Sequence, residues 1–70
     1  MNANELKAEL IRHGFTIPSY AAALGISKKT AYAKIAGKTD FTQPEIAATK
    51  EILELSDQRL LDIFFADEVS

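Results

Sequence analysis

The stretch FTIPSYAAALGISKKTAYAKIAG, residues 15–37, decides how this chain folds. Thr16 is a favoured N-cap residue, and the proline two positions later suits the first turn of a helix, where its missing N–H would have no partner. Gly25 can adopt the left-handed conformation that often ends helices, and Ser27 is a second N-cap. The stretch therefore predicts two short helices joined by a tight turn, over residues 17–24 and 28–36.

The two sides of this helix pair differ in chemistry. Ala21 is small enough to let the helices cross closely, and Ala31 and Ile35 recur on the side that faces inward. Ile26, in the turn, is expected to dip into the core. The opposite side is where a helix-turn-helix keeps the side chains that it offers to the DNA major groove. On that side the sequence has Lys28, Lys29, Tyr32 and Ala33.

The small residue, glycine, apolar residue and N-cap follow one another at offsets that resemble the helix-turn-helix of phage repressor and Cro-type regulators. The resemblance implies an all-α fold of the lambda-repressor-like class, a compact five-helix domain over residues 1–70 in which helices 2 and 3 form the motif. It also implies that residues 28–36 are the recognition helix. The residues expected to face a partner or DNA are Ser27, Lys28, Lys29, Thr30, Tyr32, Ala33, Lys34 and Lys38.

Each of these residues also has a plainer explanation. The lysine pair with a tyrosine one turn on would supply two phosphate or base-edge donors and an aromatic contact, but the same residues also suit a solvated helix face. Ser27 is sufficiently explained as a cap, and Thr30 could add a phosphate contact beside it. Lys34 and Lys38 are the weaker candidates, because helix C-termini favour cations in any case.

The rest of the chain predicts three further helices. Asn2 or Asn4 can cap the first, and Gly14 ends it. Its inward stripe is expected to comprise Leu6, Leu10 and Ile11. In the segment FTQPEI, Thr42 is an N-cap and Glu45 completes a capping box, so the fourth helix is expected from residue 43 to about residue 54. Its buried side is expected to hold Ile46, Thr49, Ile52 and Leu53.

A last short helix is expected over residues 57–65, after Ser56 or Asp57. Five large apolar residues within six positions cannot all lie on one helical stripe. The sequence therefore leaves open whether Phe64 and Phe65 belong to the core or to an interface with a partner. The final segment ADEVS is expected to fray.

Composition bounds the class of protein. The 70 residues include no cysteine, which excludes a disulfide framework and a thiolate metal site and favours a reducing compartment. No apolar run approaches the ~20 residues needed to cross a bilayer, and no signal pattern opens the chain. His13 is the only histidine, and no partnered nucleophile or ligand cluster accompanies it. We expect a cytoplasmic protein without enzymatic activity, cofactor, metal, membrane partner or small-molecule substrate.

Charge is unevenly distributed along the chain. The formal net charge is −2, yet residues 14–39 contain four lysines and no acidic residue. Residues 40–70 contain eight acidic residues against Lys50 and Arg59. The basic patch therefore coincides with the expected recognition helix, while the acidic half would repel a phosphate backbone within roughly a Debye length.

Over nearly its full length, from MNANELKAEL through LGISKKTAYAKIAGK to DIFFADEVS, the chain resembles the small modulator-of-repression proteins of temperate lactococcal phages. The resemblance implies an antirepressor that binds the phage repressor, covers its operator-binding surface and favours the lytic cycle in the bacterial host. The alternative is a stand-alone Cro-like regulator that binds operator DNA as a dimer through its recognition helix. Operator DNA is thus a second candidate partner, bound either alone or jointly with the repressor.

Several residues depart from the pattern of the DNA-binding relatives. Ile17 stands where a polar residue often holds a phosphate, Ala31 where a larger aliphatic is usual, and Ala33 where a base-reading amide or arginine is expected. The segment has no arginine for the bidentate guanine contact that is the commonest specific one. These departures favour the protein-binding hypothesis.

Overall fold

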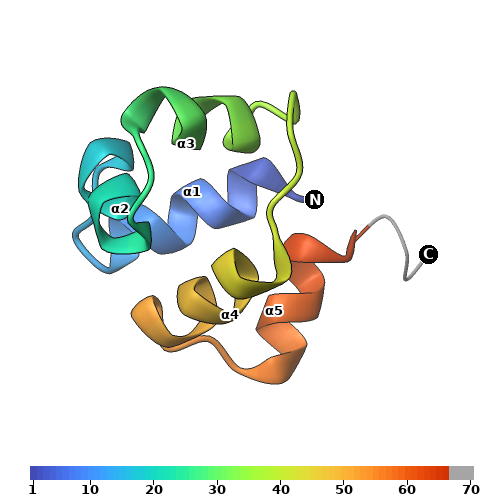
Figure 1. Ribbon diagram of the computed structural model, residues 1–70. Helices are drawn as coiled ribbons and strands as arrows, with labels where there is room; N and C mark the ends of the chain where they lie inside the picture. Colours follow the sequence, from blue (N-terminus) through green and yellow to red (C-terminus); the bar gives the residue numbers. More distant parts are fainter. Residues whose placement is uncertain (67–70) are drawn as a thin grey trace.

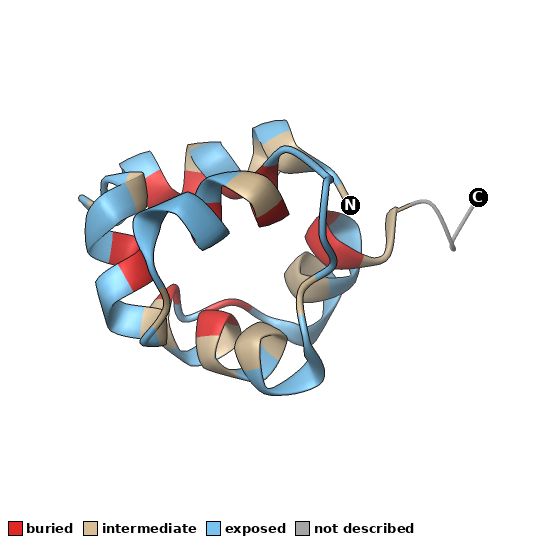
Figure 2. Ribbon diagram, turned by 45° about the horizontal axis from the view of Figure 1, so that its top comes forward, coloured by how far each residue is buried: buried red, intermediate tan, exposed pale blue. Residues whose placement is uncertain are grey.

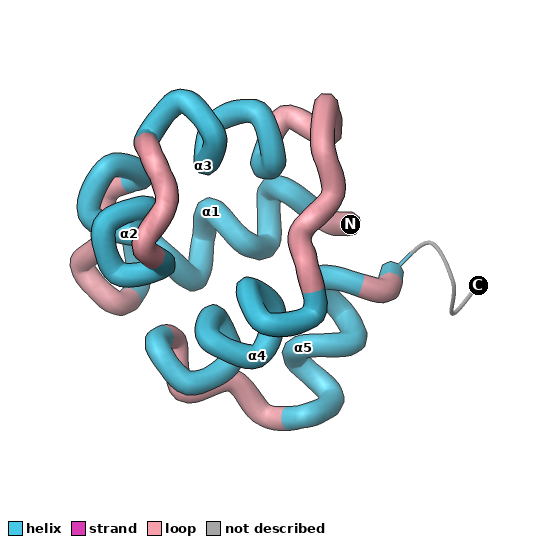
Figure 3. Tube along the Cα trace, viewed as in Figure 1, coloured by secondary structure: helices cyan, strands magenta, loops and turns pink. Residues whose placement is uncertain are grey.

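Five α-helices joined by short loops make up the computed structural model, which describes residues 1–66 (Figures 1 and 3). No strand occurs within that range, so the prediction of a five-helix, all-α chain is confirmed. The expected fraying of the C-terminal end falls on residues 67–70, outside the described residues. The helices are α1 (Ala3–Arg12), α2 (Ile17–Leu24), α3 (Lys28–Ile35), α4 (Gln43–Ile52) and α5 (Asp57–Phe64).

Local capping chemistry sets most of the helix starts. The side chain of Asn2, and not that of Asn4, caps α1. Thr16 and Thr42 cap α2 and α4 within capping boxes, and in each helix a proline occupies the first turn. The N-caps of α3 and α5 are Ser27 and Ser56. These side chains satisfy N–H groups that would otherwise lack partners in each first turn.

The end of α4 was predicted about two residues too late. The helix ends at Ile52, Leu53 is its C-cap, and Glu54 has a positive φ of 51°. The reversal at Glu54 turns both Leu53 and Leu55 into the core, where Leu53 is fully buried. Burying these two leucines stabilises the fold more than one further turn of α4 would. The sequence shows no capping residue that marks this helix end.

One hydrophobic core joins side chains from both ends of the chain, and buried positions line the inner sides of the helices in Figure 2. Ala21 and Ala31 are buried as well, in the helix pair where small residues were predicted. Phe64 lies in the core and meets Phe41 edge to face at 5.3 Å between ring centroids, whereas Phe65 is half-buried. The core residues are Leu6, Leu10, Tyr20, Ile35, Leu53, Leu55, Ile63 and Phe64.

Two apolar residues do not lie where the sequence placed them. Ile11 was predicted to face inward but is 76% exposed. It follows Leu10 directly, so it points about 100° away around the helix, and the adjoining buried position on α1 is taken by Glu9. Ile26 is only half-buried in the turn between α2 and α3. The inward stripe of α1 is therefore narrower than predicted.

Polar contacts tie the two ends of the described chain together. Arg59 of α5 donates to Glu5 and to the buried Glu9 of α1. The N–H of Asn2 donates to the carbonyl of Ile63 at 2.6 Å. These contacts hold α5 against α1, which can be followed in Figure 1.

A buried hydrogen bond connects α2 to α4. The hydroxyl of Thr49 donates to the carbonyl of Glu45 at 2.8 Å, so its single proton is used. The hydroxyl of Tyr20, 2.5 Å away, therefore donates to the Thr49 oxygen. Burial raises the pKa of Tyr20 to about 12, despite the opposing effect of the Thr49 hydrogen bond.

Tyr20→Phe is expected to flatten the loss of stability at alkaline pH. An unfolded tyrosine titrates near pH 10 and folded Tyr20 near 12, so the folded state binds this proton more tightly. That contribution is complete below pH 10 and is lost as the pH rises toward 12, by about 1.4 kcal/mol per pH unit. Urea unfolding of wild type and variant from pH 9 to 11.5 measures the difference. Tyr32→Phe is the control. Because Tyr32 is exposed, this variant should lose stability with pH as steeply as the wild type does.

Candidate partner-binding surface

The helix expected to face a partner, α3, packs chiefly against α2 and lies at one edge of the fold (Figure 1). Ala31, Lys34 and Ile35 are buried, and they define the inner side of the helix. The remaining positions point away from the core. Of the predicted partner-facing residues, Ser27, Lys28, Lys29, Thr30, Tyr32 and Lys38 are exposed and Ala33 is half-buried.

A shallow hollow of about 500 Å³ occupies the outer side of α3. We call it the Tyr32 hollow, since the ring of Tyr32, 51% exposed, is its largest side chain. Two alanines and two lysines complete its lining. Its lining residues are Lys29, Tyr32, Ala33, Ala36 and Lys38.

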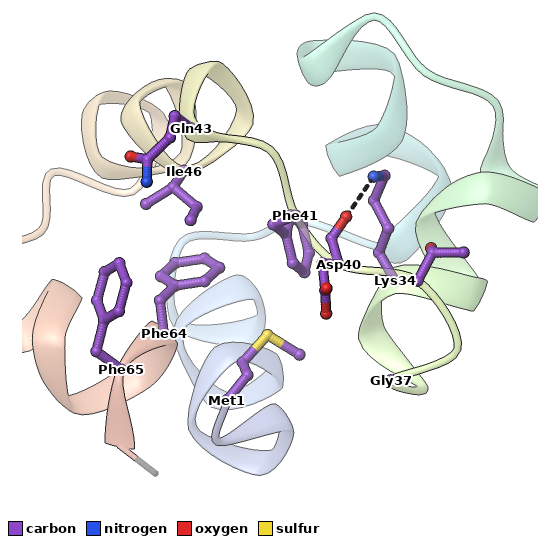
Figure 4. Close-up of a pocket in the computed structure, with 10 residues that line it drawn as sticks. Met1, Lys34, Gly37, Asp40, Phe41, Gln43, Ile46, Phe64 and Phe65 are labelled. Carbon is purple, nitrogen blue, oxygen red and sulfur yellow. Dashed lines mark hydrogen bonds between the residues drawn. The ribbon is translucent and has the colours of Figure 1, made fainter. Parts of the chain in front are cut away.

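Lys34 does not belong to this surface, and its prediction as a partner-facing residue is wrong. The residue is 8% exposed. Its ammonium group donates to the carbonyl of Asp40 at 2.8 Å and pairs with the carboxylate of Glu45 at 3.0 Å. It also lies over the ring of Phe41, 5.9 Å from the centroid (Figure 4). The sequence contained a signal for this placement, because position 34 falls on the same helical side as Ala31 and Ile35.

The carboxylate of Glu45 contacts both the N-cap of α4 and the inner side of α3. Its Oε1 accepts from the N–H of Thr42, which caps α4, and pairs with Lys34 of α3. Although burial raises the pKa of Glu45, the hydrogen bonds from Thr42 and Lys34 outweigh it and hold the pKa below its usual value. The start of α4 is thereby fixed to the inner side of α3.

The hydroxyl groups at the start of α3 are engaged within the chain. Ser27 accepts from the Thr30 N–H at 3.1 Å and donates to the Thr30 hydroxyl at 2.8 Å. This is the capping explanation that the sequence offered for Ser27. The hydroxyl proton of Thr30 is the one left for a contact outside this pair.

The surface of α3 and the side of α4 and α5 differ in their exposed charges. Within residues 1–66, Lys28, Lys29 and Lys38 form no ion pair, so the surface of α3 keeps three of its four predicted cations. On the side of α4 and α5, Asp57 pairs with Lys50, whose hydrogen bond lowers the pKa of Asp57. The exposed acidic residues of that side are Glu51, Glu54, Asp57 and Asp62.

The described residues contain neither a metal-ligand cluster nor a membrane-spanning helix. Residues 1–66 contain no group of three or more histidine, cysteine or carboxylate side chains that could hold a metal ion. Over that range, no helix has the length and apolarity needed to cross a membrane. Comparison with protein-family models, with curated proteins and with solved structures found no match to this chain.

Proposed function

We propose that this chain is a phage antirepressor, which binds the phage repressor in the bacterial cytoplasm, blocks its operator-binding surface and favours the lytic cycle. The observation that carries the proposal is the Tyr32 hollow, which is lined by a half-exposed aromatic ring, two alanines and two lysines. The resemblance to the modulator-of-repression proteins supplies the identity of the partner.

The make-up of the Tyr32 hollow suits a protein partner better than a base-pair edge. Protein interfaces are enriched in tyrosine at a dry centre and place charged groups at the rim. A base reader in the major groove needs side chains such as arginine, asparagine or glutamine, and the outer side of α3 has none. With Lys34 paired internally, the helix also offers fewer cations to a phosphate backbone than its sequence implied.

Charge on the opposite side of the molecule supports the same proposal. A surface that binds operator DNA is basic, and the acidic side of α4 and α5 would attract it during encounter. Acidic residues in this half would at the same time disfavour a long track of DNA across the molecule.

The second candidate is a Cro-like regulator that binds operator DNA directly. One observation favours it: Lys28, Lys29 and Lys38 have no ion-pair partner within residues 1–66 and stand on the outer side of α3. A dimer would read half-sites about one helical turn apart. This candidate requires that the chain bind operator DNA alone, with an affinity that falls steeply as salt rises.

A mobility-shift experiment separates the two candidates. Operator DNA is mixed with this chain, with the cognate repressor, and with both. For an antirepressor we expect no shift by the chain alone and loss of the repressor's shift when the chain is added. A strong, salt-sensitive shift by the chain alone, with the repressor's shift intact, would establish the DNA-binding candidate instead.

Tyr32→Ala is expected to weaken the complex with the repressor by about tenfold or more, the usual effect of removing an aromatic from the centre of an interface. The double substitution Lys28→Ala with Lys29→Ala should change that affinity only a few-fold, because rim charges contribute little. Tyr32→Phe is the matched control and should bind nearly as wild type. Isothermal titration of the repressor measures all three. If the double lysine substitution weakened binding more than Tyr32→Ala did, the partner would be contacting the lysines through phosphate-like groups.

A further inference from the structure

A second apolar hollow, of about 300 Å³, lies where the end of α1 meets the start of α2. We call it the Ile11 hollow. Ile11 is 76% exposed, the highest exposure among the large apolar side chains of residues 1–66. Phe15 and Ile17 are half-buried beside it, so the exposed apolar groups are gathered and not scattered. The lining residues are Lys7, Leu10, Ile11, Phe15, Thr16 and Ile17.

One cation, Lys7, lines the Ile11 hollow. The side chain of Lys7 forms no ion pair or hydrogen bond with any of residues 1–66. Residues 14–27, which follow in the sequence, carry no charge at all.

This hollow lies at the other end of α2 from the α3 surface. Figure 1 shows the end of α1, the whole of α2 and the start of α3 at one end of the molecule. The exposed residues of α2 are Pro18, Ser19, Ala22 and Ala23, none of them charged. An uncharged helix, about 12 Å long for its eight residues, therefore connects the Ile11 hollow to the proposed interface on α3.

We propose that the Ile11 hollow is a second docking surface for the same protein partner. It receives an aliphatic side chain of the partner, and a carboxylate beside that side chain meets Lys7. The identity of the partner as the cognate repressor rests on the proposed function. The chemistry of the partner segment rests on this surface, where an apolar hollow of this size lined by one unpaired lysine complements an aliphatic group that has a carboxylate beside it.

The proposal has a consequence for how the repressor is bound. An acid-flanked aliphatic segment cannot be the repressor's phosphate-contacting surface, which is basic. The Ile11 hollow would therefore grip the repressor beside its DNA-binding face, while the rest of the interface covers that face. Two separate contacts, at the Ile11 hollow and on the outer side of α3, would also fix the orientation of the complex.

The test is the affinity of the full chain for the cognate repressor, measured by isothermal titration. Ile11→Asp is expected to weaken binding by about tenfold or more, since it places a carboxylate in an apolar contact beside the partner's carboxylate. Lys7→Glu is expected to weaken it by about threefold or more for the same electrostatic reason. Thermal unfolding should give unchanged midpoints, because both side chains are exposed. Leu61→Asp, at another exposed apolar position, is the control and should bind as wild type.

The outcomes separate this proposal from the proposed function. If wild type binds the repressor and Ile11→Asp binds it equally well, the Ile11 hollow is not a docking surface and only this inference fails. If wild type does not bind the repressor, both fail. Sedimentation of the chain alone at rising concentration is the second measurement. Self-association that Ile11→Asp abolishes would make a second copy the occupant and overturn the choice of partner.

Discussion

Replacement of Ile63 by alanine is expected to lower the free energy of unfolding by about 3–4 kcal/mol, the largest effect of any substitution considered for this chain. Ile63 is fully buried in the core, and its carbonyl accepts the hydrogen bond from Asn2 that joins α5 to the start of the chain. Truncation removes three methyl or methylene groups and leaves a cavity between α5 and α1. A domain of this size has only a few kcal/mol of stability to lose.

Leu61→Ala provides the matched comparison for Ile63→Ala. Leu61 lies two residues earlier on the same helix and is 42% exposed, so its truncation should cost well under 1 kcal/mol. Urea unfolding followed by circular dichroism compares the two variants under identical conditions. Equal losses in the two would mean that α5 does not present Ile63 to the core and Leu61 to solvent.

Lys34→Met is expected to lower the free energy of unfolding by about 2–3 kcal/mol. Methionine keeps the aliphatic stem near Phe41 but removes the cation that Glu45 faces at 3.0 Å. The half-buried carboxylate retains the Thr42 N–H, which keeps the loss below the roughly 3–5 kcal/mol expected for a fully buried broken pair. Lys38→Met, in the next turn of chain, is the control and should be close to neutral, because Lys38 is exposed.

A double-mutant cycle isolates the Lys34–Glu45 pair. Glu45→Gln alone removes the negative charge that faces the ammonium of Lys34, and we expect Lys34→Met with Glu45→Gln to cost less than the sum of the two single changes. Strictly additive losses would show that the two side chains do not interact. The cycle also has a pH signature. Because the folded pKa of Glu45 is lowered, its contribution is present above the unfolded value near 4.5 and is lost as the pH falls through the folded value.

The inward placement of Lys34 also bears on function. It ties α3 to the start of α4 from the inner side, so the Tyr32 hollow is presented by a helix held on both of its ends. We expect Lys34→Met to reduce repressor binding less than Tyr32→Ala does, once the folded fraction is taken into account. A cation in the interface would give the opposite order.

Much of the fold could be predicted because its signals are local. N-cap side chains, the two prolines and Gly25 act within four residues of themselves, and they placed α2 and the starts of α3 and α4 correctly. The end of α4 lacked such a signal, because what ends it is the burial of Leu53 and Leu55. The fate of Phe64 was open for the same reason, since its partner Phe41 lies 23 positions earlier in the chain.

The candidate site, like the fold, was determined partly by local sequence signals and partly by tertiary contacts. By itself the sequence determined the helix pair, its outward lysines and Tyr32, since capping and helical period depend only on neighbouring residues. The helical period puts position 34 on the inner side of α3, but only the tertiary structure decided that Lys34 pairs there with Glu45 and that Ile11 stays uncovered. Both outcomes depend on which distant element packs against the helix, and the helical period alone does not contain that information.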